Sequence, residues 1–108
     1  MKISVVDIVK SQKAIFHEDG LFVFEAVDAA MKANEKEVEV SFDGIRVCTT
    51  QFLNASFGKL LLTYGEDVIK QKIHPVSYSA INAFSEKYTL VWENFHEKNK
   101  GFLEEAYA

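Results

Sequence analysis

The chain has 108 residues, of which 48% are apolar, so it can bury the core of one domain spanning residues 1–108. Its formal net charge of −4 and its scattered lysine and arginine residues disfavour nucleic acid binding, which needs a basic face. A lone cysteine excludes an internal disulfide, and no apolar run approaches membrane-spanning length. We therefore expect a cytoplasmic protein that contacts no membrane.

The first half of the chain predicts three strands and one helix. Met1–Val9 is rich in β-branched residues and predicts a strand, and Ala14–Phe16 predicts a second, shorter one. Asp19 is predicted to cap the helix Leu21–Ala33, which is apolar almost all round and is expected to be buried on more than one side. Glu37–Phe42 alternates charged and apolar residues with a period of two, which is typical of a strand.

In the second half the period becomes helical. Thr50–Tyr64 predicts a helix that ends at Gly65, with small residues on a face that could approach a sheet. The segment around Pro75 predicts a loop and an edge strand. Residues from about 79 to 106 carry an apolar stripe that predicts one long helix, or two broken near Gly101. This order predicts an α/β fold with a mixed central sheet of about four strands and helices packed on it.

No residue pattern predicts a catalytic site, a metal site or a cofactor site. The three histidines, His17, His74 and His96, have none of the spacings that zinc sites use, and no glycine-rich phosphate loop is present. Cys48 precedes a predicted helix N-terminus, where the helix dipole lowers a thiol pKa, but no base lies near it in sequence. A small buried side chain at a strand end is therefore the favoured interpretation of Cys48.

Thr49 and Thr50 lie where the unpaired amides of the predicted helix point outward. Either hydroxyl can cap this helix, and a phosphate there would find amide donors and a favourable dipole. Such a phosphate would add nearly two negative charges, which is a mechanism for switching a protein contact. Two interpretations stay open, a threonine cap alone and a phosphorylation site on Thr50 or Thr49.

Residues 38–60, VEVSFDGIRVCTTQFLNASFGKL, combine a buried strand, a Phe-x-Gly-Ile turn and a helix with a Gly-Lys-Leu sequence. This segment resembles the signature of the STAS-like family of bacterial domains of unassigned function. The positions that fit are Phe42, Gly44, Ile45, Thr49, Phe52, Leu53, Asn54, Gly58, Lys59 and Leu60. The resemblance extends from Ile3 to about Gly65 and implies the STAS-like fold.

The STAS fold is that of anti-sigma factor antagonists, and the resemblance therefore implies a regulatory role. In that fold a serine at the strand-to-helix turn is phosphorylated by a partner ATPase-type kinase, and phosphorylation releases the partner. In this register Thr49 takes the place of the aspartate, Thr50 that of the first serine, and Gln51 that of the phosphorylated serine. Because glutamine cannot be phosphorylated, the resemblance implies a switch only if Thr50 takes over or the register shifts by one.

The first functional hypothesis is a non-enzymatic regulatory module that binds a protein partner through residues 49–57, the strand-to-helix corner. The resemblance suggests a histidine-kinase-type ATPase, an anti-sigma-like regulator or a transcription regulator as that partner. The predicted partner-binding residues are Thr49, Thr50, Gln51 and Asn54.

Two other hypotheses remain. A structural or oligomeric adaptor would use the C-terminal aromatic stripe, and homo-oligomers would then form. The predicted oligomer contacts are Tyr88, Trp92, Phe95 and Phe102. A small enzyme or ligand binder would instead use Cys48.

Overall fold

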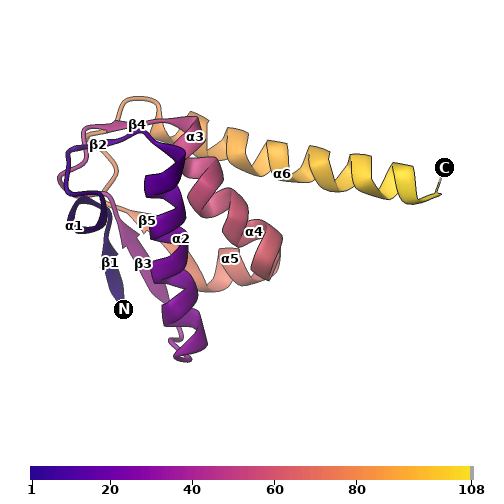
Figure 1. The fold of residues 1–108 in the computed structure, drawn as a ribbon, viewed down its shortest axis with the longest axis horizontal. Helices are drawn as coiled ribbons and strands as arrows, with labels where there is room; N and C mark the ends of the chain where they lie inside the picture. Colours follow the sequence, from indigo (N-terminus) through magenta and orange to yellow (C-terminus); the bar gives the residue numbers. More distant parts are fainter. Residues whose placement is uncertain (108) are drawn as a thin grey trace.

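The computed structural model describes the backbone of residues 1–107 and the side chains of residues 1–97 (Figure 1). The elements in chain order are β1 (Lys2–Ser4), α1 (Val5–Val9), β2 (Lys13–Ala14), α2 (His17–Lys32), β3 (Val38–Ser41), β4 (Val47–Cys48), α3 (Thr50–Leu53), the π-helical turn η1 (Asn54–Gly58), α4 (Lys59–Tyr64), α5 (Glu66–Lys72), β5 (Ile73–Val76) and α6 (Phe84–Tyr107). Strands and helices alternate along most of the chain, which confirms the predicted α/β class.

The strands of the described residues form two small sheets, and every pairing in them is parallel. One sheet has three strands in the order β1-β3-β5, and the other consists of β2 and β4. The predicted mixed sheet of about four strands is therefore wrong in strand number and direction, because β2 and β4 pair only with each other. Pro75 lies opposite Val40 on the edge strand β5, where its missing N–H costs no ladder bond on the outer side.

The prediction of a strand over Met1–Val9 is correct only for its first part. Ser4 pairs with Ser41, the last residue of β3, so the following residues have no strand to pair with on that side. Residues Val5–Val9 instead form α1, which buries Val5 and contacts α2. Tertiary packing here overrides the β propensity of the valines.

Helix α2 begins earlier than predicted and is buried on one face. Phe16 occupies the N-cap position without a side-chain hydrogen bond, so the prediction that Asp19 caps the helix is wrong. Asp19 lies in the first turn, where its negative charge interacts favourably with the positive end of the helix dipole. The buried residues Gly20, Val23, Phe24, Val27 and Ala30 form a single stripe. The opposite face carries Phe22, which is 54% exposed, so burial on more than one side is not observed.

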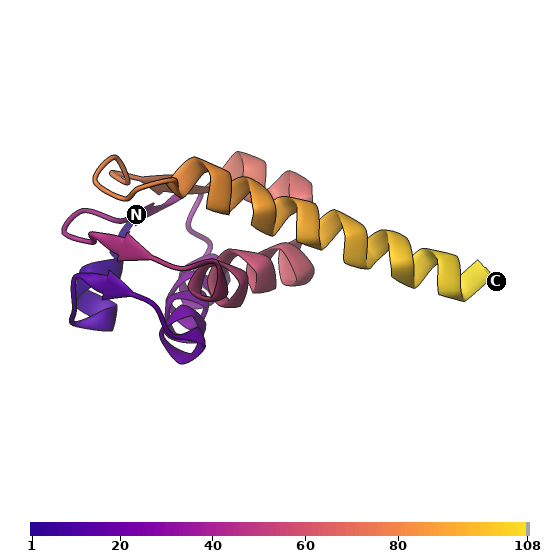
Figure 2. The same cartoon turned by 90° about the horizontal axis from the view of Figure 1, so that it is seen from above.

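The predicted helix Thr50–Tyr64 is present as the continuous run α3–η1–α4, here called the central helix. It ends at Gly65, whose φ of +87° favours glycine. Figure 2 shows this helix between α2 and α6. Its small residues approach helices rather than a sheet, since a Cβ built on Gly20 of α2 would lie 2.5 Å from the Phe52 carbonyl oxygen and 2.7 Å from Ala55 Cβ.

The last third of the chain contains one helix that was not predicted and one that was. Residues Glu66–Lys72 form α5, a helix that the sequence patterns did not predict. Helix α6 begins at Phe84 and continues past Gly101, which agrees with the alternative of one long helix. Its first turns pack on the domain, whereas its later turns extend beyond the other helices in both views (Figures 1 and 2). Among the described helices, none has the length and apolar character needed to cross a membrane.

The crossing of α2 and the central helix predicts opposite effects for two glycine substitutions. Gly20→Ala should lower the free energy of unfolding by about 1–3 kcal/mol, because the new methyl group would overlap the backbone of Phe52. Gly58→Ala is the matched control, since its Cβ would meet Asn54 and Val91 at 3.7 Å, an ordinary contact. It should leave stability unchanged or raise it by about 0.4–1 kcal/mol. Urea denaturation measures both, and equal effects would contradict the close crossing.

Candidate functional site: the strand-to-helix corner

The corner is formed by two parallel strands that lead into neighbouring helices. Ala14 of β2 pairs with Cys48 of β4, so the N-terminal ends of α2 and the central helix lie side by side. The Thr49 hydroxyl joins them, because it donates to the Ile15 carbonyl at 2.6 Å and accepts from the Phe52 amide at 3.2 Å. Thr49 is therefore the N-cap of the central helix, as one of the two open interpretations predicted.

The four predicted partner-binding residues lie on the first turns of the central helix, and they differ in exposure. Gln51 and Asn54 are exposed, while Thr49 and Thr50 are half-buried. The Thr49 hydroxyl is engaged in two hydrogen bonds. No hydrogen bond of the Thr50 hydroxyl is found within residues 1–97. Within residues 1–97, the polar groups of Thr50 and Gln51 are thus less engaged in hydrogen bonds than the Thr49 hydroxyl is.

Sequence reasoning missed two residues at the corner. Phe16 follows Ile15 directly and is 66% exposed, although it was predicted to end a strand. Lys87 reaches the corner from α6, and its ammonium donates to the Cys48 carbonyl at 2.9 Å. No local pattern could have placed Lys87 here, because it lies 39 positions away in the chain. The available signal for Phe16 was an aromatic residue directly before the polar run His17-Glu18-Asp19.

Cys48 lies at the corner but is not available as a nucleophile. Its side chain is fully buried at the end of β4. Burial raises the pKa of the Cys48 thiol to about 12, and the nearby Lys87 ammonium offsets only part of that effect. The group is therefore a thiol at neutral pH, which does not fit a catalytic cysteine. Within residues 1–97, no three His, Cys, Asp or Glu side chains gather closely enough to hold a metal ion.

The C-terminal aromatic stripe packs largely on its own chain. Tyr88, Trp92 and Phe95 are half-buried against the core, and the Tyr88 ring lies 5.1 Å from that of Phe57 in an edge-on arrangement. The Trp92 ring also lies 5.7 Å from the Lys70 ammonium of α5. The side chain of Phe102 lies outside the described residues. The main role of Tyr88, Trp92 and Phe95 in this structure is therefore to hold α6 on the rest of the domain.

The two bonds of Thr49 predict a clear order among three substitutions. Thr49→Ala should lower the free energy of unfolding by about 1–2 kcal/mol, because it removes the N-cap and leaves the Ile15 carbonyl unpaired. Thr49→Ser keeps the hydroxyl and should recover most of that loss. Thr50→Ala is the control and should change stability by less than about 0.5 kcal/mol. Urea denaturation would disprove this cap if Thr49→Ala matched the control.

The burial of Cys48 predicts slow thiol modification in the folded protein. Alkylation by iodoacetamide at pH 8 should be at least about 100-fold slower than for an exposed cysteine, since both access and thiolate content are low. The same protein in concentrated urea is the control and should react at the ordinary rate. A fast reaction without denaturant would restore the hypothesis of a reactive cysteine.

Comparison with known proteins identifies the family to which this arrangement belongs. The family described as a STAS-like domain of unknown function matches residues 19–82, which is more than half of the chain. This span includes most of α2, residues 49–57, the rest of the central helix and β5, and it ends just before α6, whereas Phe16 and Lys87 lie outside it. No curated protein and no solved structure matches the chain. The chain therefore belongs to the family of STAS-like domains of unknown function.

Proposed function

We propose that this chain is a non-enzymatic regulatory module that binds a protein partner through the strand-to-helix corner. The observation that carries the proposal is the 66% exposure of Phe16, which directly follows the Ile15 carbonyl that Thr49 binds, so that it lies at the helix end where Gln51 is also exposed. Aromatic residues often supply much of the energy of a protein interface, and exposed amides such as Gln51 supply adaptable hydrogen bonds around them.

The corner is rigid enough to present these groups in one geometry. The Thr49 hydroxyl ties the end of β2 to the central helix, and the Lys87 ammonium ties α6 to the end of β4. Segments that are distant in sequence are thereby held together at the corner. A preorganised surface loses less conformational entropy when a partner binds.

The partner proposed from the STAS-like resemblance is a histidine-kinase-type ATPase, an anti-sigma-like regulator or a transcription regulator. If phosphorylation switches its binding, Thr50 is the better acceptor of the two threonines. A phosphate on Thr49 would break the bonds to Ile15 and Phe52, whereas the half-buried Thr50 has no such role. A phosphate on Thr50 would add negative charge at the surface on which the partner docks.

An affinity pull-down from the native cell with matched variants tests the proposal. The wild-type chain should recover one of the named regulators, and Phe16→Ser should weaken that complex at least about tenfold. Phe22→Ser is the control, because Phe22 is similarly exposed at 54% but lies on the outer face of α2. Equal binding by the two variants would remove Phe16 from the interface, and recovery of no regulator would contradict the proposed function.

The same complex tests the switch. Thr50→Glu places a negative charge where the phosphate would be, and binding to the recovered partner should fall, measured by isothermal calorimetry. Thr50→Gln adds similar bulk without charge and should bind more tightly than Thr50→Glu. Unchanged binding of Thr50→Glu would eliminate the switch while leaving the interface intact.

A further inference from the structure

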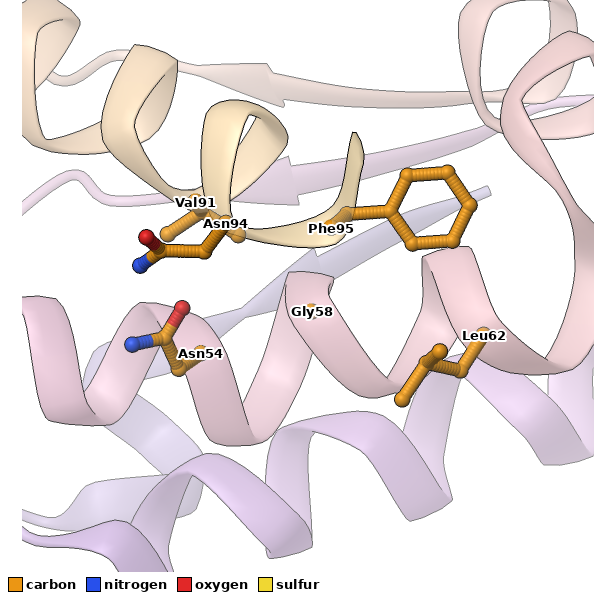
Figure 3. Close-up of a pocket in the computed structure, with 6 residues that line it drawn as sticks. All are labelled: Asn54, Gly58, Leu62, Val91, Asn94 and Phe95. Atoms are coloured by element: carbon orange, nitrogen blue, oxygen red, sulfur yellow. The ribbon is translucent and has the colours of Figure 1, made fainter. Parts of the chain in front are cut away.

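A groove lies between the central helix and α6 (Figure 3). Figure 3 shows Asn54 and Asn94 at one end of it, and Leu62 and Phe95 at the other. The groove is lined by Asn54, Gly58, Leu62, Val91, Asn94 and Phe95. Its volume of about 50 Å³ is far below the roughly 300–1,000 Å³ of small-molecule sites. The groove is therefore too small for a metabolite.

Apolar side chains border this groove without being covered. Leu62 is 61% exposed at the Phe95 end. Leu90 is 43% exposed and lies one helical turn before Asn94, on the same side of α6. A groove between two packed helices with apolar side chains along its border is a common docking place for a third, amphipathic helix.

The chain itself contains a helical segment that suits this groove. Residues 96–107 continue α6 beyond Phe95, and at about 1.5 Å per residue they are roughly 18 Å long. The groove side of the central helix, from Asn54 to Leu62, is about 12 Å long by the same measure. Phe102 follows Phe95 by seven residues, so the two positions lie on one helix face.

This segment cannot reach the groove of its own chain. Helix α6 is one continuous element from Phe84 to Tyr107, and its later turns run away from the central helix (Figures 1 and 2). A straight helix that forms one wall of the groove cannot turn back to fill it. A groove that this segment fills therefore belongs to a second copy.

We propose that two copies of this chain associate by placing residues 96–107 of each α6 in the groove of the other. Phe102 and Leu103 of one copy supply the apolar side chains, and Leu62 and Phe95 of the other receive them. The exchange is reciprocal, so the pair is closed by a two-fold axis and does not grow into a filament. The argument for this self-association does not rest on the function proposed for the corner.

Sedimentation velocity on the full chain tests the association. The wild-type protein should form a species of twice the 12.3 kDa chain mass. Leu62→Asp and Phe102→Asp should each raise the dimer dissociation constant at least about tenfold, because each places a charge in the apolar contact. Phe22→Asp is the control and should remain dimeric, since Phe22 lies on α2 outside the groove. A wild-type protein that stays monomeric, or a control that dissociates equally, would overturn the proposal.

Mixing Phe102→Asp with Leu62→Lys tests the reciprocal exchange. Leu62→Lys retains an intact α6 and Phe102→Asp retains an intact groove, so each mixed pair has one unaltered contact and one in which the introduced lysine and aspartate attract each other. The mixture should therefore associate more tightly than either variant alone. No recovery on mixing would overturn the placement of α6 in the groove. Circular dichroism of each variant verifies that the fold is kept, which the high exposure of Leu62 favours.

Discussion

Helix α2 crosses the central helix so closely that the packing of the neighbouring elements is arranged around this contact. Only a residue without a side chain allows α2 to approach the backbone of Phe52 as closely as Gly20 does. The central helix can then bury Phe52 and Phe57 between α2 and α6. The buried Ser56 hydroxyl in the same helix donates a hydrogen bond to the Phe52 carbonyl at 2.9 Å. The core of this small domain combines these helix residues with buried strand residues such as Val38, Val40 and Ile73.

This crossing also determines where the corner lies. With α2 and the central helix fixed side by side, β2 and β4 that precede them must pair in parallel, and their last residues come together. The Thr49 hydroxyl then meets the Ile15 carbonyl, and the exposed Phe16 follows next to it. The surface proposed to bind a partner is therefore a consequence of core packing.

Sequence patterns predicted the parts of the fold that depend on local periodicity, namely α2, β3 and the helix Thr50–Tyr64. They failed where a partner distant in sequence decides the outcome. Val5–Val9 has strand propensity, yet β3 has ended opposite Ser4, and a helix forms instead. At the corner, the Thr49 cap could be read from its position, whereas the contact of Lys87 with Cys48 depends on the path of α6. A charge-bearing side chain 39 positions away leaves no local signal.

Helix α6 connects the two surfaces proposed to bind protein. Lys87 near its start contacts the corner, and Phe95, eight residues or about 12 Å further along, lines the groove. Both contacts belong to one continuous helix, so a partner that moves Lys87 away from the Cys48 carbonyl also alters the wall of the groove. Coupling of this kind is reciprocal, because a second copy that fixes α6 in the groove must favour one state of the corner to the same extent. Partner binding and self-association would then be linked through α6.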